Sequence, residues 1–315
     1  MSYSMIDPQI KPILKEMAAA MKNTPAPGSR PPEQVQENFA AGQKYWNEDP
    51  PNLPAVEDEF IPGPFGPIPV RHYQPVLNTE KKPVLVFFHG GGWIAGNLDT
   101  HDYLARALAK ESSIDIISVE YGLAPERHFP ETIAECTAAV KWIRQNASSW
   151  RLDPDRIAVG GDSAGGNLSL AVALSLRDAG ETWLKFCMLF YAALNPELTS
   201  ESHRLFGGIK YGSTPDLYKW FWDSYLPQDK MKQDPLAVPL LSDMKGLPPM
   251  FVGIAACDAI RDDSLQLCRI LEAAEVPYES HVYPGTIHGF LQFLRTVNIA
   301  KIAVKDAAAA LKKGL

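Results

Sequence analysis

From residue 84 onward the sequence alternates between short apolar runs and longer amphipathic stretches. The apolar runs have the length and composition of β-strands: Val84–Phe88, Ile114–Val119, Ile157–Val159, Phe186–Tyr191, Met250–Ala255 and Tyr278–Tyr283. Helix-like stretches lie between and after them: Tyr103–Lys110, Thr132–Gln145, Gly165–Arg177, Asp262–Glu275 and Phe290–Leu311. Apolar strands that alternate with helices predict an α/β fold, with a mostly parallel sheet covered by helices on both faces.

Two regions interrupt this alternation. Residues 1–50 contain the helix-like stretches Ile10–Met21 and Pro32–Trp46, and residues 196–243 form an insertion with an aromatic stretch, Asp216–Tyr225. Because long insertions in compact domains are usually functional, we expect these two regions to form a helical cap over the carboxyl ends of the strands. Residues 51–195 and 244–315 are then the main domain. The alternative is that the aromatic side chains only pack the insertion onto that domain.

The composition of the chain argues against several classes of protein. The chain has 315 residues, of which 46% are hydrophobic, and a net charge of −7, which argues against a nucleic acid as partner. The first residues lack the pattern of a signal peptide, and no apolar stretch is long enough to span a membrane. The four cysteines, Cys136, Cys187, Cys257 and Cys268, have no metal-binding spacing. These features predict a soluble, cytoplasmic protein with free thiols.

A serine flanked by glycines follows one of the predicted strands. Gly161-Asp162-Ser163-Ala164-Gly165 lies between an apolar strand and a helix-like stretch, the context that a Gly-x-Ser-x-Gly nucleophile elbow requires. Glycine on either side leaves room for a strained turn that exposes the serine hydroxyl. A plain tight turn is the alternative for the pentapeptide alone, but the strand and helix favour a nucleophile at Ser163.

A run of glycines follows the first strong strand, in the sequence His89-Gly90-Gly91-Gly92-Trp93. Glycines in a row allow backbone N–H groups to approach a ligand, and in serine hydrolases such groups stabilise an oxyanion. The pairing of an HGGG motif with the elbow is a known feature of lipases and esterases. A flexible surface turn is the alternative.

A general base and an orienting acid are expected downstream of the serine. Of the later histidines, His203 falls in the insertion and His281 within a strand, whereas His288 follows the last strand on a loop that can return to Ser163. Asp258 comes first after the preceding strand and is the preferred acid. Asp262, at the start of a helix, is the fallback.

Taken together, these segments resemble the hormone-sensitive-lipase branch of the α/β-hydrolases, which includes bacterial carboxylesterases and arylacetamide deacetylases. The resemblance spans about residues 84–293 and is carried by His89–Trp93, Tyr121–Glu126, Asp155–Gly166, Asp258–Asp263 and His288–Phe290. It implies Ser163 as nucleophile, His288 as base and Asp258 as acid. It also implies oxyanion-hole N–H groups from Gly91, Gly92 and Ala164, and a cap from the two irregular regions. The chain departs from the family at Asp258-Ala259-Ile260, where Asp-Pro-Leu is usual, and at Val238-Pro239-Leu240, where Ser-Pro-Leu is usual.

The expected activity is hydrolysis of short- to medium-chain acyl esters through an acyl-serine intermediate, with no metal or organic cofactor. Candidate pocket residues are Trp93, Leu205, Phe206, Tyr218 and Trp222. An amidase, deacetylase or lactonase would share every motif. A non-catalytic receptor or a dehydratase of the same fold is disfavoured because serine, acid and histidine are all present. Homodimerisation through the last strand and Phe290–Leu311 is expected by analogy.

Overall fold

An eight-stranded sheet forms the centre of the molecule in a computed structural model that describes residues 5–22, 25–26, 28–78 and 80–315. The strand order is β1-β2-β4-β3-β5-β6-β7-β8. The strands are β1 (Ala55–Gly63), β2 (Gly66–Gln74), β3 (Lys82–Phe88), β4 (Asp115–Val119), β5 (Leu152–Asp162), β6 (Leu184–Phe190), β7 (Met250–Ala255) and β8 (Tyr278–Tyr283). Strands β3 to β8 are parallel, and β2 pairs antiparallel with β1 and β4. The predicted α/β fold is confirmed.

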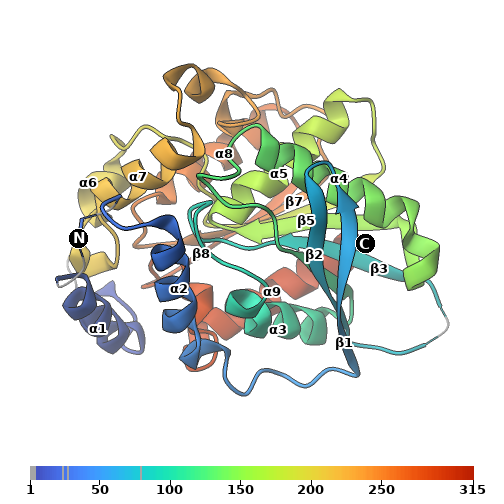
Figure 1. Ribbon diagram of the computed structural model, residues 1–315, viewed down its shortest axis with the longest axis horizontal. Helices are drawn as coiled ribbons and strands as arrows, with labels where there is room; N and C mark the ends of the chain where they lie inside the picture. Colours follow the sequence, from blue (N-terminus) through green and yellow to red (C-terminus); the bar gives the residue numbers. More distant parts are fainter. Residues whose placement is uncertain (1–4, 23–24, 27, 79) are drawn as a thin grey trace.

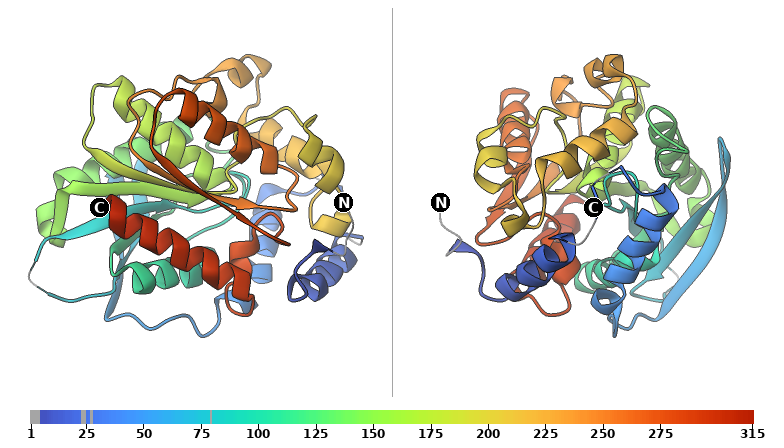
Figure 2. Two further views of the ribbon diagram at one scale, coloured as in Figure 1. Left: turned by 180° about the vertical axis from the view of Figure 1, so that it is seen from behind. Right: turned by 60° about the vertical axis from the view of Figure 1, so that its left-hand side comes forward.

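Helices cover both faces of the sheet (Figures 1 and 2). The helices α4 (Glu131–Gln145), α5 (Ala164–Asp178) and α8 (Arg261–Ala273) bury side chains in one apolar cluster. The helices α3 (Asp102–Ser112) and α9 (Asn298–Gly314) bury theirs in a second cluster on the other face. The middle strands are buried on both sides, which is why they read as continuous apolar runs.

The carboxyl ends of the parallel strands β3 to β8 lie at one end of the molecule, beside the two irregular regions. The N-terminal region holds α1 (Ile10–Lys22), α2 (Pro32–Gln43) and the 3-10 helix η2 (Tyr45–Asn47). The insertion holds α6 (Glu201–Phe206), η5 (Ile209–Tyr211), α7 (Pro215–Tyr225), η6 (Asp229–Gln233) and η7 (Pro239–Leu241). Figure 1 shows α1, α2, α6 and α7 gathered at this end.

The two irregular regions contact each other. A Cβ added at Gly28 would lie 3.0 Å from the Trp220 ring of α7, and one added at Gly212 would lie 3.2 Å from Met17 of α1. The N-terminal region and the insertion therefore pack directly against each other at these two points.

One sequence-based boundary needs correction. Phe290–Leu311 is not one helix: η8 (Phe290–Phe293) is followed by a break, and α9 begins only at Asn298. Ahead of the predicted strands, β1 and β2 form a nine-residue hairpin ladder from Ala55 to Gln74. Among the described residues, no helix has both the length and the apolarity needed to cross a membrane.

Candidate active site

Ser163 lies in a sharp turn between β5 and α5. Its backbone has φ 53° and ψ −117°, a strained conformation for a residue with a side chain. The close approach of neighbouring chain explains the flanking glycines: a Cβ at Gly161 would lie 2.3 Å from the Phe88 carbonyl oxygen, and one at Gly165 only 1.9 Å from it. The Ser163 N–H donates to the Phe190 carbonyl at 2.9 Å, which fixes the turn to β6. The serine side chain stays partly exposed.

Three side chains from separate loops meet in a hydrogen-bonded line. Ser163 Oγ lies 2.8 Å from His288 Nε2, and His288 Nδ1 lies 2.8 Å from Asp258 Oδ2. Asp258 is 1% exposed, and its other oxygen, Oδ1, accepts the Ile260 N–H at 3.0 Å. The carboxylate therefore orients the imidazole so that Nε2 faces the serine hydroxyl, an arrangement that can remove the hydroxyl proton.

The alternatives considered from the sequence lie elsewhere. His281 Nε2 contacts Glu279 at 2.9 Å, and His203 Nδ1 contacts Ser200 at 2.7 Å. Asp262 accepts the Ser202 N–H at 2.8 Å and forms an ion pair with Arg261. None of these contacts reaches Ser163.

Burial and charge act in opposite directions on His288. Burial by itself would lower the pKa of this imidazole, but the Asp258 carboxylate outweighs it through charge and hydrogen bonding, so the pKa of His288 is raised above its ordinary value. The same interaction favours the imidazolium that forms when the histidine takes up a proton.

The glycine run after β3 wraps tightly and borders the same cavity as Ser163. Gly91 has φ 127° and Gly92 has φ 63°, and a Cβ at Gly91 would lie 2.0 Å from the Ala95 carbonyl oxygen. The Ala95 N–H donates to the Gly91 carbonyl at 3.0 Å and closes the turn. Ala164 is the first residue of α5, where backbone N–H groups are free to bind negative charge.

A cavity of about 340 Å³ leads to Ser163 and His288. Its walls are mainly apolar and come from α1, α2, α7 and the glycine run, with Met17, Val35, Phe39, Leu217, Trp220 and Phe221 among the lining residues. Phe221 lies directly over the glycine run, because a Cβ at Gly92 would be 2.5 Å from its ring.

The pocket residues expected from the sequence are only partly correct. Tyr218 lines the cavity, and its hydroxyl lies 3.5 Å from Asp258 Oδ1. Trp93, Phe206 and Trp222 are at most 2% exposed and do not line it. Leu205 is half-buried and packs against the second apolar cluster instead. The pocket assignment of these four residues is therefore corrected.

The correction has a clear structural reason. The Trp93 ring stacks on Tyr225 with centroids 4.3 Å apart and lies 4.6 Å from Trp222, so the buried face of α7, which carries Trp222 and Tyr225, packs on Trp93. The neighbouring face of α7, with Leu217 and Phe221 four residues apart, borders the cavity. That spacing was a signal in the sequence, whereas no motif marks Met17, Arg30 or Phe39 of the N-terminal region.

The described part of the chain contains no group of three or more His, Cys, Asp or Glu residues arranged to hold a metal ion. The cysteines are free and buried. Burial raises the pKa of the Cys187 thiol, which disfavours its reactive thiolate form.

Comparisons with known proteins find esterases among the relatives of this chain. The sequence model of one family, described as "alpha/beta hydrolase fold", matches residues 85–292. An acetyl esterase from Salmonella dublin is 33% identical over 311 residues, covering 94% of each chain. A hyperthermophilic esterase from Pyrobaculum calidifontis has a similar structure, with TM-score 0.93, 34% identity and 98% of each chain covered. A thermostable esterase from Pseudomonas putida aligns with TM-score 0.91 and 30% identity over 99% of this chain and 98% of the other.

Proposed function

Because the chain belongs to the hormone-sensitive-lipase-like branch of the α/β-hydrolase family and is a carboxylic ester hydrolase, we propose that Ser163, His288 and Asp258 are its catalytic residues. The observation that carries the proposal is the unbroken line of two 2.8 Å contacts from Ser163 Oγ through His288 to Asp258, at the floor of an apolar cavity. Nucleophile, base and orienting acid in this order are the parts of a serine hydrolase triad.

Acylation uses each of these groups in turn. His288 Nε2 takes the proton of Ser163 as Oγ attacks the ester carbonyl carbon, and a tetrahedral oxyanion forms. The C–O bond to the leaving alcohol then breaks, and the imidazolium returns the proton to the alcohol oxygen. Water repeats the sequence on the acyl-serine, so that the carboxylic acid leaves and Ser163 is regenerated. Asp258 stays ionised and stabilises the imidazolium at both stages.

The backbone N–H groups of Gly91, Gly92 and Ala164 are the proposed donors to the oxyanion. Gly91 and Gly92 border the cavity that contains Ser163. Donors fixed in position before the reaction stabilise the transition state more than the ground state, because negative charge on the oxygen develops only during attack.

Short- to medium-chain acyl esters are the proposed substrates. The cavity of about 340 Å³ is small, and Phe221 and Trp220 of α7 both line it, with Phe221 over the glycine run. Acetyl esterases are among the relatives, which supports a small acyl group. Residues 1–50 and 196–243 form the cap in this proposal, since they supply most of the apolar wall.

We also propose that the protein is a cytoplasmic homodimer that does not bind nucleic acid. A homodimer formed through β8 is supported by its place at the edge of the sheet. The net charge of −7 supports a protein that does not bind nucleic acid. A cytoplasmic location accords with the four free cysteines.

Replacement of the nucleophile tests the central proposal. Ser163→Ala should lower kcat on p-nitrophenyl acetate by about 10⁴- to 10⁶-fold while leaving the fold intact, because the acyl-serine can no longer form. Wild-type kcat/KM measured on esters of graded acyl length should peak at short chains. Matched anilides and lactones in the same assay compare amide and lactone cleavage with ester cleavage. Wild-type activity in Ser163→Ala would refute the assignment.

A further inference from the structure

A buried carboxylate sits directly behind the glycine run. Asp162, the residue before Ser163, is 1% exposed, and its Oδ1 accepts the Gly90 N–H at 2.9 Å. The contact leaves no free space, because a Cβ at Gly90 would lie 2.6 Å from Asp162 Oδ2. The start of the glycine run is therefore held by a side chain of the nucleophile turn itself.

His101 faces the same carboxylate from the other side. His101 Nε2 lies 3.4 Å from Asp162 Oδ1, and both side chains are almost fully buried. Burial alone would raise the pKa of Asp162, but His101 and the Gly90 N–H outweigh it and hold that pKa below its usual value. Asp162 is thus an ionised group in the interior, which needs hydrogen-bond donors or positive charge around it.

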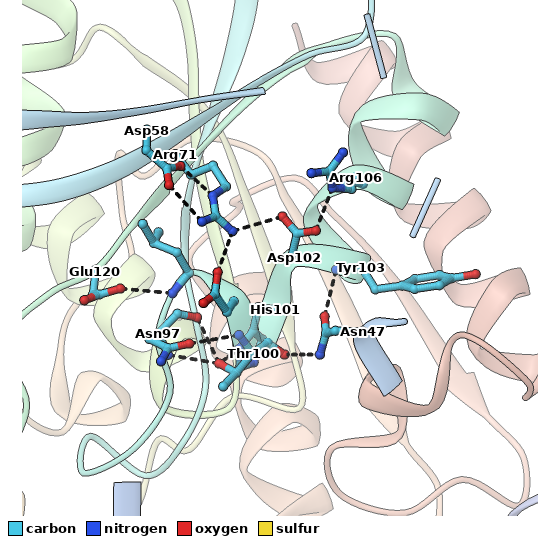
Figure 3. A network of polar contacts seen from close by, with 12 residues as sticks. Asn47, Asp58, Arg71, Asn97, Thr100, His101, Asp102, Tyr103, Arg106 and Glu120 are labelled. Atoms are coloured by element: carbon cyan, nitrogen blue, oxygen red, sulfur yellow. Dashed lines mark hydrogen bonds and ion pairs between the residues drawn. The ribbon is translucent and has the colours of Figure 1, made fainter. Parts of the chain in front are cut away.

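The position of His101 is fixed by a polar network around the 3-10 helix η3 (Asp99–His101), shown in Figure 3. His101 Nδ1 contacts Thr100 Oγ1 at 2.9 Å, which leaves Nε2 as the nitrogen that faces Asp162. Asn97 exchanges hydrogen bonds with Thr100, and Asn47 donates to the Thr100 carbonyl at 3.0 Å. These contacts prevent the imidazole from turning away from the carboxylate.

The same network extends to the edge of the sheet, where it borders a second cavity of about 920 Å³. Arg71 of β2 binds Asp58, Asp99 and Asp102 together (Figure 3). These side chains form ion pairs with one another, so we assign them a role in supporting η3 rather than in binding a ligand in the second cavity.

We propose that His101 is a positioning residue for catalysis: through Asp162 it holds Gly90, and thereby the Gly91 and Gly92 N–H groups, in the geometry that receives the oxyanion. The inference rests on the proposed function, because it takes those N–H groups to be oxyanion donors. His101 itself does not line the substrate cavity. Its effect must therefore reach the reacting atoms through the loop.

Small displacements of the loop suffice for a kinetic effect. An oxyanion donor works only at about 2.7–3.1 Å from the oxygen, and loss of one donor costs about 10²- to 10³-fold in kcat. Without an N–H from residue 101, the donors left to the Asp162 carboxylate among the described residues are the Gly90 N–H on Oδ1 and the Tyr191 hydroxyl, 3.4 Å from Oδ2. The carboxylate then relaxes toward other donors and draws Gly90 with it. Ground-state binding of the ester depends on the apolar cavity walls and is little affected.

The test compares His101→Phe, which keeps a ring but has no N–H, with His101→Gln, which retains an amide donor near the position of Nε2. His101→Phe should lower kcat by about 10- to 100-fold with KM changed less than about 3-fold, and His101→Gln should recover most of the loss. Affinity for a trifluoromethyl ketone, whose adduct with Ser163 carries an oxyanion, should weaken by the same factor as kcat/KM. In the double variant with Asp162→Asn, the two effects should not add, because both act through one contact.

His72→Phe is the matched control. His72 is another buried histidine bonded to a carboxylate, Asp115, at 2.8 Å, but it belongs to β2 and does not contact the glycine run. It should lower the melting temperature and leave kcat unchanged.

The experiments distinguish failure of the proposed function from failure of the role proposed for His101. Full activity of Ser163→Ala, or no inhibition of wild-type enzyme by the trifluoromethyl ketone, would remove the proposed function. If Ser163→Ala is inactive and the ketone inhibits the wild-type enzyme, but His101→Phe keeps wild-type kcat or changes only KM, the role of His101 is refuted. Should His101→Phe not fold, the kcat and ketone affinity of Asp162→Asn decide by the same criteria.

Discussion

At the scale of single residues, the site depends on backbone positions that only small side chains allow. Gly161 and Gly165 both pack against the carbonyl oxygen of Phe88, so the nucleophile turn is fastened to the end of β3. The glycine run begins directly after that strand. Backbone packing therefore determines the position of Ser163 relative to the proposed oxyanion donors. Side-chain motion changes this relative position little.

The pH dependence of the reaction follows from His288. Only its neutral imidazole can take the Ser163 proton, so kcat/KM for a neutral ester should fall as pH decreases through the pKa of His288. Burial lowers that pKa, but Asp258 raises it more, so the midpoint should lie above the ordinary value for histidine. A pH–rate profile of kcat/KM measures the midpoint.

Asp258→Asn provides the comparison for this profile. Loss of the carboxylate should move the midpoint to lower pH and decrease kcat by about 10³-fold or more. A midpoint that does not move would contradict the assignment of Asp258 as the partner of His288.

At the scale of elements, α7 connects the insertion to the site. Its buried face, which carries Tyr225, packs on the Trp93 ring, and Phe221 on the neighbouring face lies over Gly92. One short helix is thus packed against the base of the glycine run and also forms a wall of the cavity. The size of its side chains sets the space left for the acyl group.

Phe221→Ala should extend the acyl range. The ring is half-buried against the cavity, and its removal opens room for additional methylene groups, each worth about 0.8 kcal/mol when buried. Room for two such groups raises the ratio of kcat/KM on octanoyl to acetyl esters by about 10-fold. Lys219→Ala, on the exposed side of the same helix, is the control and should leave the ratio unchanged. An unchanged ratio in Phe221→Ala would show that α7 does not limit chain length.

The sequence predicted the parts of the site that depend on local backbone and missed those that depend on packing between distant segments. Ser163 and the glycine run are recognisable because each is a short motif of adjacent residues, even where the close contact that requires glycine, such as Phe88 at Gly161 and Gly165, comes from a distant strand. Trp222 and Phe206 were misassigned because an aromatic residue in an insertion has the same local signature whether it faces a cavity or a core. The face of α7 toward the cavity is set by Trp93, which lies more than a hundred residues earlier.

At the scale of the whole molecule, both edges of the sheet carry exposed apolar side chains. In the described part of the chain β8 is paired with β7 alone, and Val282 on it is 53% exposed, with Ile302 of α9 at 49%. An uncovered edge strand with apolar side chains is a site where a second chain can pair. This edge is distant in the sheet order from β1, where Phe60 is also exposed.

Dimerisation through β8 is tested by charge at this edge. Wild-type protein should have the mass of two chains in size-exclusion chromatography with light scattering, and Val282→Lys should shift it to the mass of one. Phe60→Lys on β1 serves as the control and should leave the dimer in place. A wild-type monomer, or a dimer that persists in Val282→Lys but not in Phe60→Lys, would contradict the proposed interface.

The reacting residues and the cavity-lining helices belong to different parts of the fold, and this has an evolutionary consequence. Ser163, Asp258 and His288 all follow strands of the central sheet, whereas most of the apolar side chains in the cavity wall come from α1, α2 and α7, outside that sheet. Mutations in these helices can alter which esters fit while the reacting groups stay where the strands hold them. Selection can therefore change substrate specificity in small, tolerated steps. Descendants of one ancestral hydrolase can then differ in the esters they cleave while they keep the same catalytic residues.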